Sequence, residues 1–113
     1  MSPEQAMGKE VDHRTDIWSM GVILYEMITG QLPFKGDYEQ AVIYSIINED
    51  PESITNSRKD LPEALESIIK KALAKNPSER DSDLVYINVE RTYDRIRTDP
   101  RFKAYVKKMR FPE

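Results

Sequence analysis

Residues 15–29 read Thr-Asp-Ile-Trp-Ser-Met-Gly-Val-Ile-Leu-Tyr-Glu-Met-Ile-Thr, and this stretch decides the fold. Its apolar side chains lie all around a helix and leave almost no polar face: Ile17, Trp18, Met20, Val22, Ile23, Leu24, Tyr25, Met27 and Ile28. A helix that is apolar on all sides must be buried on most of them. Gly30 supplies a helix stop, and Pro33 keeps the chain from resuming a helix at once. We therefore expect a buried central helix.

The rest of the chain predicts more helices, because no segment alternates cleanly between apolar and polar residues as a strand would. Helix-period apolar patterns, proline near a first turn and lysines near a last turn mark these segments. We expect an all-α fold of about four to five helices around the central apolar helix. The further helices are expected at 38–48, 62–75, 83–97 and 100–109.

The expected helix at 38–48 has two apolar sides. Asp37 is its predicted N-cap, with Gln40 at the capping-box position. One stripe consists of Tyr38, Ala41, Val42 and Ile46, and the other of Ile43, Tyr44 and Ile47. Two stripes imply two contacts, one with the core and one with a partner or a neighbouring loop. Tyr44 and Ile47 are therefore the candidate partner-binding residues.

Composition excludes several classes of function. The 113 residues fit one small domain, and 20 acidic against 17 basic residues give a net charge of −3 without the concentrated basic face of a nucleic-acid binder. With no cysteine and one histidine, disulfides and clusters of thiolate or imidazole metal ligands are excluded. No apolar run reaches the roughly 18 residues of a membrane span. We expect a soluble, cytoplasmic protein with no nucleic-acid or membrane partner.

Four short motifs give the chain its family resemblance. They are Met1-Ser2-Pro3-Glu4, Asp16-Ile17-Trp18-Ser19-Met20-Gly21, Leu32-Pro33-Phe34, and Asn76-Pro77 followed by Arg80. A single apolar helix with a tryptophan is usually plain core, but the order and spacing of all four are more specific. They resemble the C-terminal part of the large lobe of a bacterial-type serine/threonine protein kinase. The first motif is similar to the element that closes a kinase activation segment.

The resemblance assigns structural roles to particular residues. It implies a buried ion pair between Glu4 and Arg80, in which a planar guanidinium takes a carboxylate and holds two distant loops together. It also matches Asp16 to the aspartate that orients the kinase catalytic loop. Without that loop, Asp16 becomes an ordinary carboxylate in the first turn of a helix. The other family motif positions are Pro3, Trp18 and Gly21.

The parts of a kinase that perform chemistry are missing from these residues. There is no Gly-rich phosphate loop, no strand lysine paired with a helix glutamate, no His-Arg-Asp loop and no Asp-Phe-Gly. Phosphoryl transfer depends on the positioning that these parts provide. Asp12-His13-Arg14 follows the Ser-Pro-Glu element, whereas a catalytic loop must precede it. We therefore expect no catalytic, cofactor-binding or metal-binding residue here, although the intact family uses ATP and Mg²⁺.

The resemblance divides the chain into a partial kinase large lobe at 1–82 and a helical C-terminal extension at 83–113. Residues 98–102 and 107–109 are similar to the closing segment of bacterial proteins that join a kinase domain to tetratricopeptide-type repeats. The expected function is thus a truncated kinase fragment, inactive by itself. A non-catalytic helical protein-interaction module and a non-functional translated fragment are the alternatives. Absence of the catalytic loop should also expose a large apolar patch on the central helix, which predicts a protein partner or self-association.

Overall fold

The computed structural model describes residues 1–57, 61, 63–80 and 83–100, and within these ranges the chain forms helices and no strand. The predicted all-α class is confirmed. Three of the seven helical segments are single turns of four residues. The segments are α1 (Pro3–Ala6), α2 (His13–Thr29), α3 (Glu39–Asn48), α4 (Ile54–Ser57), α5 (Glu63–Ala72), α6 (Pro77–Arg80) and α7 (Asp83–Thr98).

The four longer helices match four of the predicted ranges to within a few residues. α2 begins two residues before Thr15, because Asp12 caps it by accepting a hydrogen bond from the backbone N–H of Arg14 at 2.9 Å. It ends where predicted, since Gly30 takes the left-handed conformation at φ 73° and donates its N–H to Glu26 O. The short helix expected at 100–109 lies, beyond Pro100, outside the described residues.

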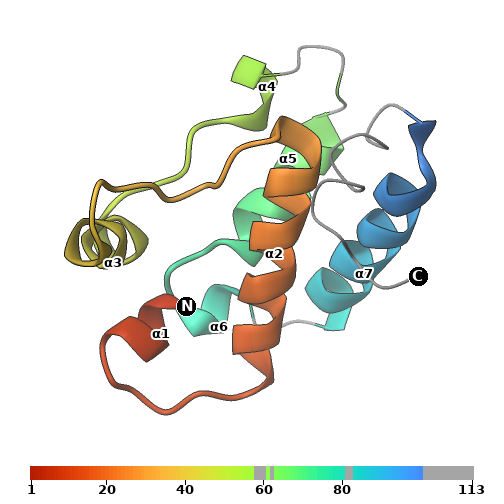
Figure 1. The fold of residues 1–113 in the computed structure, drawn as a ribbon. Coiled ribbons are helices and arrows are strands. Elements are labelled where there is room, and N and C mark those ends of the chain that lie inside the picture. Colours follow the sequence, from red (N-terminus) through yellow and green to blue (C-terminus); the bar gives the residue numbers. More distant parts are fainter. Residues whose placement is uncertain (58–60, 62, 81–82, 101–113) are drawn as a thin grey trace.

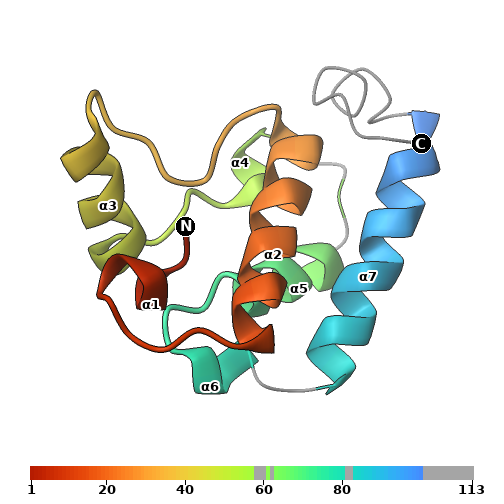
Figure 2. The ribbon, with the colours of Figure 1, turned by 60° about the horizontal axis from the view of Figure 1, so that its bottom comes forward.

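α2 stands at the centre of the molecule, with α5 and α7 on one side and α1 and α3 on the other (Figures 1 and 2). Both α5 and α7 pack directly against α2, and they also pack against each other. α7 contributes Val89 and Ile96 to the same core as the preceding helices. The buried side chains of α2 in this core are Ile17, Trp18, Leu24, Tyr25, Met27 and Ile28.

The expected apolar patch on α2 is not found. Its remaining apolar side chains, Met20, Val22 and Ile23, are partly buried and packed against the core, so α2 presents no exposed apolar side chain. The prediction was wrong because neighbouring helices already cover α2. The most exposed large apolar side chains among the described residues lie elsewhere: Met1, Tyr38 and Tyr44 are each above 60 % exposure.

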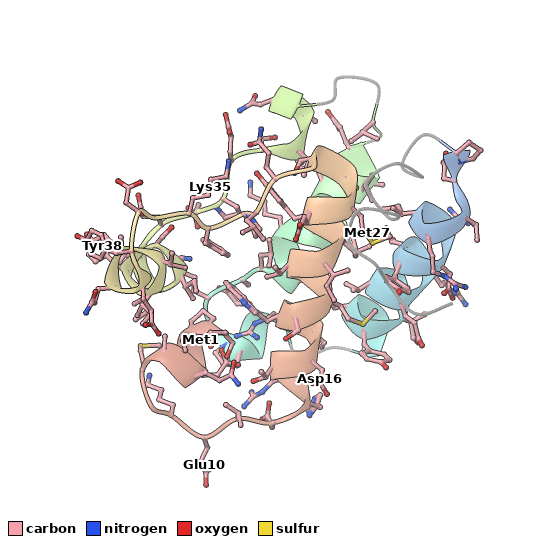
Figure 3. The ribbon with its side chains drawn as sticks, in the orientation of Figure 1. Met1, Glu10, Asp16, Met27, Lys35 and Tyr38 are labelled. Atoms are coloured by element: carbon pink, nitrogen blue, oxygen red, sulfur yellow. The ribbon has the colours of Figure 1, made fainter. Side chains whose placement is uncertain are left out.

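The predicted cap of α3 is also wrong. Tyr38, not Asp37, is the N-cap, with extended backbone and no hydrogen bond from its side chain to the helix. The carbonyl of Tyr38 accepts the N–H groups of Ala41 and Val42 at 3.1 and 3.2 Å. Because the helix starts one residue later than expected, Gln40 is not at the capping-box position. The Tyr38 ring is left 64 % exposed at the outer end of α3 (Figure 3).

Gly21 lies at a close contact between α2 and the end of α5. A Cβ atom added at Gly21 would lie 2.8 Å from the Cβ of Ala72 and 3.1 Å from Cδ2 of Leu73. Helix propensity favours alanine over glycine by about 1 kcal/mol, but overpacking costs about 1–3 kcal/mol. The steric term should exceed the propensity term, because the nearest atom belongs to a short, immobile side chain.

We expect Gly21→Ala to lower the free energy of unfolding by about 1–2 kcal/mol in urea titrations followed by circular dichroism. Ala72→Gly in the same chain should remove the clash. The double-mutant cycle should therefore give a favourable coupling between the two substitutions. Purely additive effects would show that α2 and α5 do not meet at this point.

Candidate functional site

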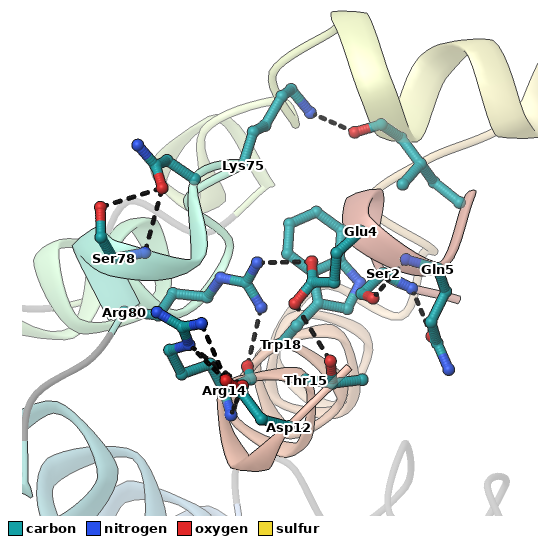
Figure 4. Close-up of polar contacts among 12 residues, drawn as sticks. Ser2, Glu4, Gln5, Asp12, Arg14, Thr15, Trp18, Lys75, Ser78 and Arg80 are labelled. Atoms are coloured by element: carbon teal, nitrogen blue, oxygen red, sulfur yellow. Dashed lines mark hydrogen bonds and ion pairs between the residues drawn. The ribbon is translucent and has the colours of Figure 1, made fainter. Parts of the chain in front are cut away.

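A buried ion pair joins the first helix to the sixth. Arg80 Nη2 donates to Glu4 Oε1 at 2.7 Å, and the two residues are 0 % and 2 % exposed (Figure 4). The second carboxylate oxygen accepts from Thr15 Oγ1 at 3.0 Å. Arg80 Nη1 donates to the backbone carbonyl of Arg14 at 2.7 Å. One guanidinium thus holds α6 against both α1 and the first turn of α2.

The pairing is less symmetrical than a fork-to-fork contact. The carboxylate uses one oxygen for the ion pair and accepts a hydrogen bond from Thr15 with the other. The guanidinium uses one nitrogen for the ion pair and donates to the Arg14 carbonyl with another. Arg80 Nε is buried and has no hydrogen-bond partner among the described residues. The guanidinium carbon lies 5.3 Å from the centroid of the Trp18 ring. The aromatic face therefore provides an electrostatically favourable neighbour to the cation.

Glu4 lies in the single helical turn α1, whose backbone is held by a capping box. Ser2 caps α1: its Oγ accepts the N–H of Gln5 at 3.3 Å, and the Gln5 side chain accepts the N–H of Ser2 at 2.8 Å. Pro3 follows in the first helical turn, where its missing N–H costs no hydrogen bond. The carbonyl of Glu4 accepts the N–H of Lys9 at 2.8 Å. These hydrogen bonds hold the backbone on both sides of Glu4 in place.

Trp18 belongs to a cluster of side chains that links four parts of the chain. Its Nε1 donates to the carbonyl of Met1 at 3.0 Å, and its ring stacks on Phe34 with centroids 5.3 Å apart. Lys75 Nζ lies 4.7 Å from the Phe34 centroid and donates to the carbonyl of Ile46 at 2.7 Å. We call Trp18, Phe34 and Lys75 the ring cluster. It connects the N-terminus, the loop before α3, the end of α3 and the loop after α5.

The remaining predicted residues occupy separate places. Pro3, Trp18 and Gly21 are buried, whereas Asp16 is exposed at the lower end of α2 in Figure 3. Tyr44 is 62 % exposed on α3 and Ile47 is partly buried. The structure therefore brings Glu4, Arg80 and Trp18 together and leaves Tyr44 and Ile47 on another surface. The supporting roles of Thr15, Phe34 and Lys75 were not predicted.

The described ranges lack a metal-binding cluster and a membrane-spanning helix. Residues 1–57, 61, 63–80 and 83–100 contain no group of three or more His, Cys, Asp or Glu that could hold a metal ion. No helix of that part of the chain is long and apolar enough to span a membrane. The polar cluster around Arg80 consists of its guanidinium, the Glu4 carboxylate with which it is paired, and the Thr15 hydroxyl, which donates to that carboxylate. Such an arrangement fixes backbone positions and offers no free nucleophile.

The environment of Glu4 changes its acidity. Burial alone raises the pKa of the carboxyl, but the hydrogen bond and charge of Arg80, the backbone N–H and the Thr15 hydroxyl together hold this pKa below its ordinary value of 4.5. The unfolded chain lacks these neighbours and therefore binds the proton first as the pH falls. Stability from Glu4 is present above pH 4.5 and is lost as the pH falls through the lower pKa of the folded state.

We expect the free energy of unfolding to decrease between about pH 5 and pH 3 more steeply in the wild-type chain than in Glu4→Gln. Urea titrations at a series of pH values measure both curves. Other carboxylates with lowered pKa values, such as Asp12, are present in both proteins, so the difference isolates Glu4. Parallel curves would contradict the assignment.

Comparison with known proteins agrees with this geometry. The protein kinase domain family matches residues 1–90. The serine/threonine-protein kinase PknB of Mycolicibacterium smegmatis is 46 % identical over 80 residues, which cover 71 % of this chain and 13 % of that protein. PksC of Streptomyces coelicolor is 41 % identical over 80 residues, covering 71 % and 14 %. The serine/threonine-protein kinase pkn3 of Myxococcus xanthus is 44 % identical over 82 residues, which cover 71 % of this chain and 15 % of that protein.

The chain therefore spans about 13–15 % of the length of these relatives. The family match at residues 1–90 covers all four motifs, including both partners of the buried ion pair. On these grounds the chain belongs to the serine/threonine protein kinases of the protein kinase domain family.

Proposed function

We propose that these residues serve a protein that transfers a phosphoryl group from ATP to serine or threonine side chains of other proteins. Within it they form the C-terminal part of the large lobe, and their role is architectural. The observation that carries the proposal is the Glu4–Arg80 ion pair, which fixes the turn containing Ser2-Pro3-Glu4 against α2 and α6. In the family this turn closes the activation segment.

The 113 residues are proposed to be inactive by themselves. They contain none of the sequence elements that position ATP, Mg²⁺ and the attacking hydroxyl in the family. Neither cofactor is expected to bind this chain alone. The ion pair and the ring cluster can position backbone, but they present no group for holding a nucleotide.

The test is an assay with labelled ATP, Mg²⁺ and a generic acceptor protein, with a complete serine/threonine kinase as the positive control. The purified chain should transfer no label above the protein-free blank. Activity that copurifies with the chain and disappears in Asp12→Asn or Asp16→Asn would overturn the proposal. Activity that is unchanged in both variants would indicate a contaminating kinase.

A second function, a helical protein-interaction module, is supported by the outer surface of α3. Tyr44 is 62 % exposed there, and Ile47 lies one turn further along the helix and is partly buried. Aromatic side chains are enriched among residues that carry binding energy at protein interfaces. Under this proposal α3 binds a protein partner or a second copy of the chain.

Sedimentation equilibrium over a series of concentrations tests the self-association form. Tyr44→Ala and Ile47→Ala should weaken the association, whereas Tyr86→Ala, which removes a 41 % exposed ring from α7, should not. Equal association constants for all four proteins would argue against α3 as the surface.

The likeness of residues 98–109 to the end of kinase–tetratricopeptide fusion proteins stays a prediction. The family match ends at residue 90, and residues 101–113 lie outside the described ranges.

A further inference from the structure

A pocket of about 610 Å³ lies away from the ion pair, between the later part of α2, α4, α5 and the loop that follows α5. Its floor consists of four side chains that are each no more than 4 % exposed: Tyr25, Ile54, Ile69 and Leu73. A volume of this size is typical of sites that bury a ligand or a few side chains. Neither Glu4 nor Arg80 lines it, so the proposed architectural role leaves it unused.

The rim of the pocket carries an excess of negative charge. Four carboxylates line it, from Asp50, Glu52, Glu66 and Glu79, against two ammonium groups, from Lys70 and Lys75. Lys75 Nζ is held by the carbonyl of Ile46 and lies over Phe34, so it belongs to the ring cluster. The rim is therefore complementary to a cation that is attached to an apolar body.

Hydrogen bonds fix one wall of the pocket. Tyr25 Oη donates to the carbonyl of Glu52 at 2.7 Å, and burial together with the charge of Glu52 raises the pKa of this phenol. Ser53 Oγ donates to the carboxylate of Glu66 and is also hydrogen-bonded to Thr55. These bonds tie the segment before α4 to α2 and α5. A preformed wall binds a ligand with less loss of conformational entropy.

The sequence after α7 has the complementary chemistry. Residues 101–111 read Arg-Phe-Lys-Ala-Tyr-Val-Lys-Lys-Met-Arg-Phe, with five basic, three aromatic and no acidic side chains. The thirteen residues that follow Pro100 can extend about 43 Å at roughly 3.3 Å per residue. The docking part, residues 101–111, extends about 36 Å on the same basis, which is comparable to the longest dimension of the molecule, 39 Å.

We propose that residues 101–111 of the same chain dock into this pocket, with an aromatic ring over the apolar floor and the flanking lysines or arginines opposite the acidic rim. Apolar burial supplies affinity, and charge complementarity orients the segment. The proposal concerns an intramolecular contact and does not depend on phosphotransfer.

Disulfide trapping in the 113-residue chain tests it, since its sequence contains no cysteine. Ala74→Cys places a thiol on the pocket wall and Met109→Cys places one in the basic segment, and neither changes the charge. The matched control pairs Met109→Cys with Ser19→Cys, because Ser19 is exposed on α2 and does not line the pocket. Oxidised glutathione starts the reaction, and non-reducing gels with mass spectrometry identify the product.

The Ala74/Met109 pair should form an intramolecular disulfide about tenfold faster than the control pair, because docking raises the effective concentration of one thiol near the other. Lys107→Glu with Lys108→Glu should abolish this advantage, whereas Lys107→Arg with Lys108→Arg should keep it. About 1 M sodium chloride, where the Debye length is about 3 Å, should reduce it.

Equal rates for the two pairs would overturn the proposal, as would failure of both pairs to react. A disulfide-linked dimer whose yield rises with protein concentration would assign the segment to a second copy and would also overturn it. Circular dichroism of each reduced variant ensures that the compared chains are folded.

Discussion

Arg80→Met is expected to lower the free energy of unfolding by about 3–5 kcal/mol, the cost typical of breaking a buried ion pair from one side. Glu4 is 2 % exposed, and in the variant the Thr15 hydroxyl is the one side-chain partner that its carboxylate keeps. The variant also loses the hydrogen bond from Arg80 to the Arg14 carbonyl. Methionine fills much of the volume without charge, so the loss reports electrostatics more than a cavity. Urea unfolding followed by circular dichroism measures it.

Two further variants separate the causes. Glu4→Met combined with Arg80→Met removes both charges, and it should be more stable than Arg80→Met alone, because no unpaired charge is left buried. Arg80→Lys keeps the charge but cannot reach Glu4 and Arg14 with separate nitrogens, so it should fall between the wild type and Arg80→Met. A loss below about 1 kcal/mol for Arg80→Met would mean that the pair behaves like an exposed one.

A small domain has only about 5–15 kcal/mol of stability in total, so Arg80→Met can unfold a large fraction of the molecules. The titration is therefore run with a stabilising osmolyte such as sucrose for all variants. Differences between variants at one sucrose concentration then remain measurable.

Trp18→Ala is the second large loss, again about 3–5 kcal/mol. The side chain is 1 % exposed, stacks on Phe34 and faces the guanidinium of Arg80, so its removal leaves a cavity beside a buried cation. It also deletes the hydrogen bond to the carbonyl of Met1. Far-ultraviolet circular dichroism is the measurement, because Trp18 is the only tryptophan of the chain and its fluorescence disappears with it.

Trp18→Phe gives the matched control, since it keeps an aromatic ring but loses the indole N–H and some volume. It should cost less than Trp18→Ala. Tyr86→Ala, on the exposed side of α7, should change the free energy of unfolding by no more than about 0.5 kcal/mol. If Trp18→Ala were as mild as Tyr86→Ala, the ring cluster would not contribute to the core.

The central helix was predictable because its signal is local and redundant. Many apolar residues in 15–29 agree on burial, and Gly30 marks the end independently. The fold class follows from this helix and the periodic segments after it. The pairing of Glu4 with Arg80 came from the family motifs, since no local pattern connects residues 76 positions apart.

Other features were not predictable from local patterns. Asp37 and Gln40 satisfy a capping-box rule, but α3 begins at Glu39 because the backbone of Tyr38 is extended. The ring cluster depends on Lys75 meeting Phe34 across 41 positions of sequence, which no periodicity encodes. The same holds for the expected patch on α2, since burial of that helix depends on how closely α5 and α7 approach.

The Glu4–Arg80 contact has a consequence for the order in which the chain is made. Translation proceeds at about 5–20 residues per second, so Arg80 follows Glu4 by roughly 4–15 s. During that interval the Ser2-Pro3-Glu4 turn lacks the guanidinium that binds it to α2. Burying the Glu4 carboxylate without this cation would cost desolvation free energy that no ion pair offsets. We expect the Ser2-Pro3-Glu4 turn to stay undocked on the ribosome until α6 has emerged.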